Sequence, residues 1–256
     1  TVLEQAASLS FSSKENSLSF ASTPPFLFVI MTREAQALGE GAKKTAISWT
    51  GGKDCNLAML LAWRNPALDV AALVVFRPEA ANFRAHPLPV MQAQAASLGL
   101  PLHHVIIGSD YKADYVSGLR NLRAEHGIET VVTGDMDLVG TMKRNWMEEC
   151  GEEAGTGVWL PLWQSDRLKN LEQILTEGIS VVYSCVKTPH FDQSWIGRPL
   201  DRAALAEMQA KVEGGLDLGG EKGEYHTMAL GGPLFQQQLD IRDQRAEELA
   251  GQAGQC

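Results

Sequence analysis

The stretch SWTGGKDC, residues 48–55, lies between an apolar segment and an amphipathic one. Residues 45–49 are expected to form a β-strand, and residues 55–64 a helix whose apolar side chains recur on one side. The two glycines between them let the backbone turn tightly and approach a ligand closely. N–H groups at the start of the helix would then face an anion, and Lys53 adds a positive charge. The stretch therefore predicts a phosphate-binding loop.

Three further residues of this loop add side-chain chemistry. Asp54 would repel a bare phosphate, but its carboxylate suits a bridging Mg²⁺. Thr50 and Cys55 have short side chains that can reach phosphate oxygens. A tight turn with Asp54 as a helix cap is the structural alternative. A strand, a glycine pair, Lys-Asp and a helix in this order favour the phosphate site.

Apolar and amphipathic segments keep alternating beyond the loop. The expected elements are strands at 70–76, 102–107 and 130–133 and helices at 87–98 and 111–125. This order is typical of an α/β fold with a doubly wound parallel sheet and helices on both faces. Ligands bind such sheets beyond the carboxyl ends of the strands, which is where the predicted phosphate loop lies.

The pattern changes after about residue 155, where a smaller second α/β unit is expected. Its expected elements are helices at 166–177 and 201–212 and strands at 180–186 and 225–230. A glycine-rich acidic loop, residues 213–224, precedes the last strand.

The composition of the chain limits the kinds of partner that the protein is expected to bind. The net charge of -9 argues against general nucleic-acid binding, which needs Lys and Arg to neutralise phosphates. No apolar run approaches the ~20 residues of a membrane helix, so no membrane partner is expected. The four cysteines form no CxxC pair and fit a reducing compartment, so we expect a cytoplasmic protein. A homodimer is left open.

The loop resembles that of the PP-loop superfamily, whose members cleave ATP between the α and β phosphates. Further motifs occur in the order seen in the diphthine–ammonia ligase family: TGDM at 133–136, PLW at 161–163, GR at 197–198, GEKGEYHT at 220–227 and GPLF at 232–235. The resemblance runs from about residue 45 to residue 241. It implies a HUP-like (adenine nucleotide alpha hydrolase-like) sheet followed by a smaller C-terminal α/β domain.

In that family, ATP adenylates the carboxylate of diphthine on elongation factor 2, and ammonia displaces AMP to give diphthamide. The resemblance therefore implies an AMP-forming ligase with ATP and Mg²⁺ as cofactors. Its implied partners are ATP, ammonium and elongation factor 2.

The resemblance also implies roles for individual residues. The implied nucleotide site comprises Ser48, Thr50, Gly51, Gly52, Lys53, Asp54, Cys55 and Gly134, with Asp54 and Asp135 as metal ligands. The implied acceptor and ammonia site comprises Glu221, Glu224, Tyr225 and His226. The catalytic residues would be Lys53, Asp54, Asp135, Glu221 and Glu224. Carboxylates can attract ammonium and accept its proton, and a lysine with Mg²⁺ can stabilise leaving pyrophosphate.

With these roles the chain divides into four parts. We expect a flexible N-terminal extension (1–43), a PP-loop ATP-binding domain (44–155), a C-terminal acceptor-binding domain (156–245) and a flexible tail (246–256).

Four positions depart from the family pattern: Cys55 replaces a serine, Leu218-Gly219 replaces Pro-Cys, and His226 replaces a glutamate. The GEYHT form, residues 223–227, is similar to a prokaryotic branch of the family. A PP-loop enzyme acting on a small molecule or tRNA, and a nucleotide-binding module without turnover, therefore stay open as alternatives.

Some residues have a structural alternative or no assigned chemistry. Asp135 could cap a helix, and Glu221 with Glu224 could form a solvated acidic loop. His86 follows an apolar strand and a polar loop, where it could contact adenine, but we expect a structural or surface role for it. The other expectations are packing or solvent positions for His103 and His104, a helix carrying Lys143 and Arg144, and core or interdomain anchors at Trp146, Trp159, Trp163 and Trp195.

Overall fold

The computed structural model describes residues 6–11, 18–20, 36–80, 83–138, 143–241 and 244–249, and these residues form three β-sheets. The largest sheet has the order β5-β4-β3-β6-β7 and is parallel throughout. Its strands are β3 (Lys43–Ser48), β4 (Leu68–Arg77), β5 (Leu102–Ile106), β6 (Thr130–Val132) and β7 (Gly157–Trp159). The chain runs outward in both directions from β3, so the carboxyl end of β3 is a topological switch point.

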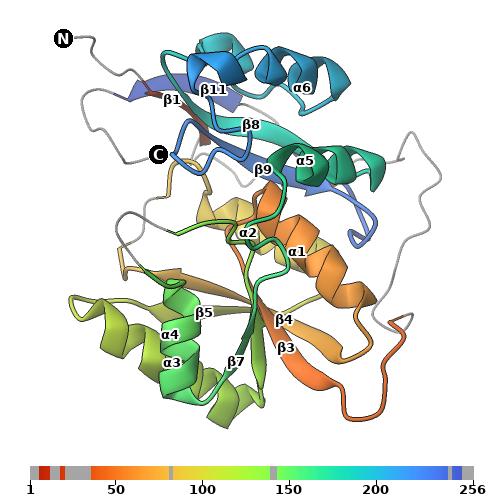
Figure 1. The fold of residues 1–256 in the computed structure, drawn as a ribbon, viewed down its shortest axis with the longest axis vertical. Coiled ribbons are helices and arrows are strands. Elements are labelled where there is room, and N and C mark those ends of the chain that lie inside the picture. Colours follow the sequence, from red (N-terminus) through yellow and green to blue (C-terminus); the bar gives the residue numbers. More distant parts are fainter. Residues whose placement is uncertain are drawn as a thin grey trace.

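Helices cover both faces of this sheet, which confirms the predicted doubly wound α/β fold (Figure 1). One face packs against α1 (Lys53–Arg64) and α2 (Leu88–Leu98), and the other against α3 (Tyr111–His126) and α4 (Trp146–Ala154). Most residues of β4 are apolar and buried, and β3 is buried at Thr45, Ala46 and Ile47, as expected for strands covered on both sides.

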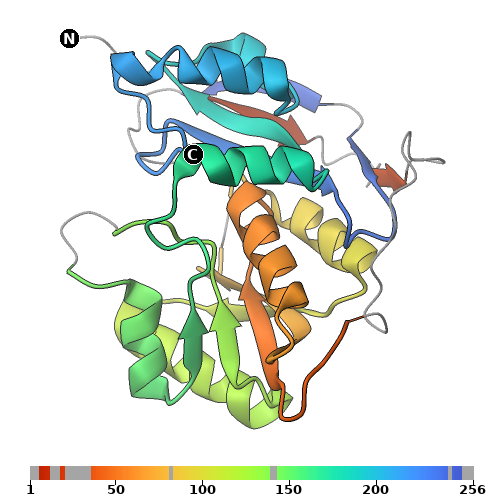
Figure 2. The ribbon, with the colours of Figure 1, turned by 45° about the vertical axis from the view of Figure 1, so that its right-hand side comes forward.

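A second sheet, with the order β11-β1-β8-β9, lies on the far side of α1 and α2 (Figure 2). At its centre β8 (Ser180–Lys187) pairs antiparallel with β9 (Tyr225–Gly231), and α5 (Arg167–Thr176) and α6 (Arg202–Gln209) pack around this pair. One apolar cluster contains Leu60 of α1, Tyr183 of β8 and Ala229 of β9. The two predicted units therefore share a single core.

The range predicted as a flexible N-terminal extension contains strands instead. β1 (Ala6–Phe11) pairs antiparallel with β8 and with β11 (Gln244–Leu249), and β2 (Leu18–Phe20) pairs with β10 (Leu239–Ile241). An apolar strand such as β8 leaves backbone donors and acceptors at its edge, and β1 pairs with that edge. β11 likewise includes residues 246–249 of the range predicted as a flexible tail. The other residues before 36 and after 249 lie outside the described residues.

Several local expectations also differ from the structure. α1 begins at Lys53, two residues earlier than predicted. α4 begins at Trp146 after the capping residue Asn145, so Lys143 and Arg144 precede this helix rather than lie on it. Cys55 and Cys150 are free thiols, but Cys185 is in a disulfide, which departs from the expectation of reduced cysteines. No helix among the described residues has the length and apolar character that a bilayer crossing requires.

Gln94 of α2 joins the loop after β3 to the second sheet. The side chain is fully buried and accepts a hydrogen bond from Trp49 Nε1 (3.1 Å). Its Nε2 donates to the carbonyl oxygens of Gly51 (3.0 Å) and Ala229 (2.7 Å). The Ala229 N–H also donates to Gly51 O (2.8 Å). The loop is therefore held from two directions.

We predict that Gln94→Leu lowers the free energy of unfolding by about 2–4 kcal/mol, because it leaves the Trp49 N–H and two carbonyl groups without this partner. Gln92→Leu, at an exposed position of the same helix, is the matched control. Urea unfolding of both variants measures the difference. Equal effects of the two substitutions would show that the network adds no stability.

Candidate active site

The predicted phosphate loop turns at Gly51 and Gly52 and leads directly into α1. Gly51 has φ of 79°, a conformation that favours glycine, and a Cβ there would collide with the Gln94 side chain. Gly52 caps α1 without a side-chain hydrogen bond, and a Cβ at this residue would lie 3.1 Å from the carbonyl oxygen of Thr227. Small residues are therefore required at these two positions, where the loop packs closely against β9.

A cavity of about 400 Å³ opens at the start of α1. The phosphate loop, the residue His86 after β4, and the segment 219–227 contribute its walls. The lining residues are Thr50, Gly52, Lys53, Asp54, Cys55, His86, Gly219, Gly220, Glu221, Gly223, Tyr225, His226 and Thr227. The cavity thus brings together most of the predicted nucleotide residues and three of the four predicted acceptor residues.

Lys53 is buried between the two units, with 4% of its surface exposed. Its ammonium donates to Asp54 Oδ2 (2.8 Å) and to Gly219 O (2.5 Å), and it lies 4.9 Å from the centre of the Tyr225 ring. Its backbone N–H donates to Thr227 Oγ1 (3.0 Å). Both the charge and the first helical amide of α1 therefore contact the C-terminal unit.

Asp54 meets the requirements of a cation ligand at one oxygen. Its Oδ2 is held by Lys53, whereas Oδ1 is buried and has no hydrogen-bond partner among the described residues. No group of three or more His, Cys, Asp and Glu within the described ranges could hold a metal ion. Mg²⁺ commonly binds proteins through one or two carboxylates and takes its other ligands from water and substrate phosphates. The donor set at Asp54 fits that mode.

Gly134 and Asp135 follow β6 beside the phosphate loop. A Cβ at Gly134 would lie 2.6 Å from the backbone carbonyl carbon of Asp54, so this glycine packs directly on the start of α1. Asp135 does not line the cavity, and its Oδ2 accepts from Asn145 Nδ2 (2.8 Å). Asn145, not Asp135, caps the following helix. A metal-binding role for Asp135 stays a prediction.

Glu221 lies at the cavity wall with a perturbed carboxyl group. Loss of hydration, followed by repulsion from Asp54, raises the pKa of Glu221 to about 7. A carboxyl group with a raised pKa can both accept and return a proton near neutral pH.

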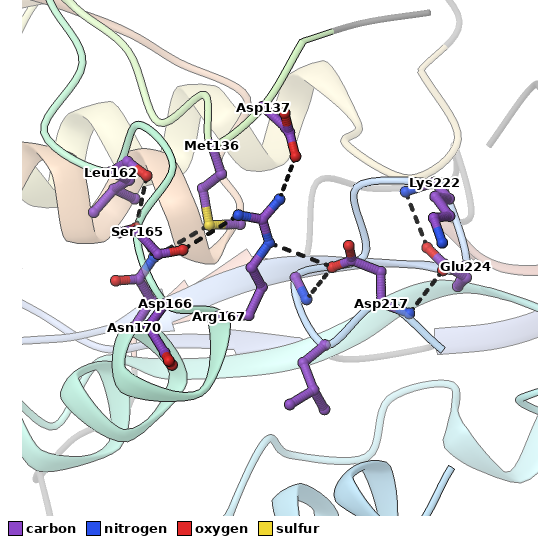
Figure 3. A network of polar contacts seen from close by, with 12 residues as sticks. Met136, Asp137, Leu162, Ser165, Asp166, Arg167, Asn170, Asp217, Lys222 and Glu224 are labelled. Carbon is purple, nitrogen blue, oxygen red and sulfur yellow. Dashed lines mark hydrogen bonds and ion pairs between the residues drawn. The ribbon is translucent and has the colours of Figure 1, made fainter. Parts of the chain in front are cut away.

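Glu224, predicted beside Glu221 in the acceptor site, does not line the cavity and shapes the loop; its acceptor role stays a prediction. It is buried, and its two carboxylate oxygens accept from the backbone N–H groups of Asp217 and Lys222, each at 3.0 Å (Figure 3). Carboxylates that accept backbone N–H groups in this way close tight loops. Within this structure Glu224 therefore holds the segment that presents Glu221.

Arg167 ties the same loop to the end of β6 (Figure 3). It contacts Asp137 Oδ2 through Nη2 (2.7 Å) and Asp217 Oδ1 through Nε (3.7 Å). Asp217 Oδ1 also accepts from the N–H of Gly219, whose carbonyl oxygen holds Lys53. Arg167 was not singled out in the sequence, because nothing in its local pattern reveals these distant partners.

His86 and His226 lie next to each other in the lining of the cavity. Their rings are 5.3 Å apart and nearly perpendicular. Burial is the main cause that lowers the pKa of His86 to about 3 and that of His226 to about 4, and nearby Lys53 lowers both further. The structure therefore moves His86 from the expected structural or surface role into the site. Its place after the carboxyl end of β4 was the signal that could have found it.

Of the remaining predicted residues, Cys55 lines the cavity, and the others described here have packing or surface positions. Burial raises the pKa of the Cys55 thiol to about 11, so it lies in the loop as a neutral group. Ser48 ends β3 outside the cavity lining. Arg144 pairs with Glu152 through two hydrogen bonds rather than facing the cavity. Trp195 is buried in an aromatic cluster of the C-terminal unit, as an anchor residue would be.

Comparisons with solved structures give weak similarities. A predicted subunit of tRNA methyltransferase from Methanocaldococcus jannaschii is 13% identical with a TM-score of 0.43, over 74% of this chain and 97% of that chain. A formyltetrahydrofolate deformylase from Pseudomonas syringae pv. tomato is 14% identical with a TM-score of 0.29, over 58% and 46% of the two chains. Both TM-scores are too low to carry an argument about this protein.

Sequence comparisons are more specific. The diphthine–ammonia ligase of Schizosaccharomyces pombe is 26% identical over 158 residues, which is 59% of this chain and 25% of that protein. The chain thus spans about a quarter of the length of this relative. The family profile of the diphthamide synthase N-terminal domain matches residues 43–157, and that of the C-terminal domain matches residues 166–254. Since these matches cover most of the chain and both walls of the cavity, the protein belongs to the diphthamide synthase family.

Proposed function

We propose that this protein is an ATP-dependent carboxylate–ammonia ligase that forms an acyl adenylate and releases AMP and pyrophosphate. The main support is the single cavity in which Lys53 and Asp54, at the start of α1, face Glu221 from the C-terminal unit. A site of this kind offers a cation for phosphates and a proton acceptor for an amine within one cavity.

In the first step, an oxygen of the acceptor carboxylate attacks the α-phosphorus of ATP, and the bond to pyrophosphate breaks. The buried ammonium of Lys53 provides positive charge beside the departing phosphates. Asp54 Oδ1 would hold Mg²⁺, which supplies further charge neutralisation when it is bound.

In the second step, ammonia attacks the acyl carbon, and the bond to the AMP oxygen breaks. The nitrogen then carries one proton too many, and Glu221 is the group placed to accept it. A carboxylate with its pKa raised to about 7 is a stronger base than an ordinary glutamate, so it suits this transfer.

For the acceptor, we propose diphthine on elongation factor 2. Both family profiles and the name of the fission yeast relative support this choice. Ammonium supplies the nitrogen, and the ligase would act in the cytoplasm. Complementation of cells that lack diphthine amidation, with diphthamide measured by mass spectrometry, tests the acceptor directly.

A nucleotide-binding module without turnover is the second candidate. One observation favours it: the Lys53 ammonium and N–H already have partners in Gly219 and Thr227. ATP binding without release of pyrophosphate, in the presence of ammonium and diphthine-bearing acceptor, would support this candidate over the ligase.

We predict that Lys53→Ala and Asp54→Asn each weaken Mg·ATP binding by about 10–100-fold, because each removes a charged group that contacts phosphate or its metal. Calorimetric titration of folded protein measures the dissociation constants. Lys44→Ala, at an exposed position of β3, is the matched control and should bind ATP as the parent does. Parental affinity in both site variants would rule out the phosphate loop. Release of ADP and phosphate instead of AMP and pyrophosphate would refute the reaction class.

A second prediction concerns pH. Glu221 acts as a base only when it is deprotonated, so the parental rate should rise through about pH 7, where its carboxyl group titrates. Dividing the parental rate by that of Glu221→Gln removes the titration of ammonia itself, which both proteins share. We expect this ratio to increase up to about tenfold per pH unit below the pKa and to level off above it. A flat ratio would exclude Glu221 as the base, and Glu213→Gln, at an exposed position, is the matched control.

A further inference from the structure

His86 lines the cavity, and the proposed mechanism gives it no role. Its Nδ1 is buried and has no hydrogen-bond partner among the described residues, although the residue as a whole keeps some accessible surface. Buried polar atoms in native proteins nearly always have a partner. Because His86 lines the cavity, a bound ligand is a natural source of that partner.

The ring has a defined orientation relative to the phosphate loop. Its Cε1 atom lies 3.4 Å from the position that a Cβ on Gly52 would occupy. Cε1 is the carbon between the two ring nitrogens, so the nitrogen-bearing edge of the imidazole faces Gly52. Gly52 is the N-cap of α1, where the N–H groups of the first turn attract anions.

Burial and nearby charged residues determine the protonation state of the His86 ring. Lys53 is cationic, and the other facing residues are His226, whose ring is 5.3 Å away, and Asp54. Burial, His226 and Lys53 together lower the pKa of His86 to about 3, so the imidazole is neutral. A neutral imidazole has one N–H donor and one acceptor nitrogen. It can hydrogen-bond an anion without adding a second cation beside Lys53.

We infer that His86 is a phosphate-binding residue, which donates a hydrogen bond from its neutral ring to a phosphate oxygen at the start of α1. The ring of His226 packs edge to face against the His86 ring and supports it. This inference rests on the proposed function, because it assumes that the loop holds polyphosphate. An anion fits this position better than ammonium does, since the charge of Lys53 acts on His86, whereas Glu221 belongs to the other wall of the cavity.

Two substitutions separate the hydrogen bond from the shape of the ring. His86→Phe keeps a planar ring but removes both nitrogens, and His86→Gln keeps a polar donor. His103→Phe, on β5 away from the cavity, is the matched control. Titrations with Mg·ATP, inorganic pyrophosphate and adenosine measure the dissociation constants, and the thermal midpoint of each variant confirms that it is folded.

We expect His86→Phe to weaken binding of Mg·ATP and pyrophosphate by about tenfold or more and to leave adenosine binding within about twofold. His86→Gln should recover most of the lost affinity, and His103→Phe should match the parent. Unchanged ATP and pyrophosphate affinities in both His86 variants would overturn the inference. So would an increased KM for ammonium at unchanged ATP affinity, which would place the ring on the amine side.

Lys53→Ala in the same titrations distinguishes this inference from the proposed function. If the parent binds both phosphate ligands and loses them with Lys53→Ala but not with His86→Phe, only the role of His86 is wrong. If the parent binds neither ligand, the phosphate loop and the role of His86 are both wrong.

Discussion

The buried ammonium of Lys53 is the interaction on which the site depends. A charge removed from water is costly unless it is paired and hydrogen-bonded, and Lys53 meets that need with Asp54 from its own helix and the carbonyl oxygen of Gly219 from the C-terminal unit. The Tyr225 ring covers part of the same charge. The two units must therefore pack closely for Lys53 to be buried at all, and the shared apolar core around α1 and β8 allows this.

The acidic loop opposite Lys53 has a shape set by two other residues. Glu224 holds the loop from inside through the N–H groups of Asp217 and Lys222. Arg167 holds it from outside and connects it to Asp137 after β6. A site that stabilises developing charge needs its polar groups fixed before the substrate arrives, and these contacts fix the segment carrying Glu221. The ends of β3 and β6 and the loop before β9 thus form one connected polar network.

Sequence periodicity predicted the part of the fold that is local. A short stretch of sequence is enough to recognise the apolar runs at β4 and β6 and the glycine pair at 51 and 52. The parallel sheet and the phosphate loop could therefore be predicted. β1 could not, because its partner β8 lies more than 170 residues away along the chain. The surroundings of Glu224 and His86 could not be predicted for a similar reason. Their chemistry is decided by which backbone N–H groups or loops lie next to them in space, not by their sequence neighbours.

The contacts of the phosphate loop make the two halves of the cavity interdependent. A phosphate at the start of α1 would need the Lys53 N–H and ammonium, which now donate to Thr227 and to Gly219. Both partners belong to the segment that carries Glu221 and His226. The donors proposed to recognise the nucleotide are thus the donors that hold the opposite wall. For a two-step reaction this arrangement has a clear physical use, because the position of the amine-side groups can respond to whether phosphate is bound.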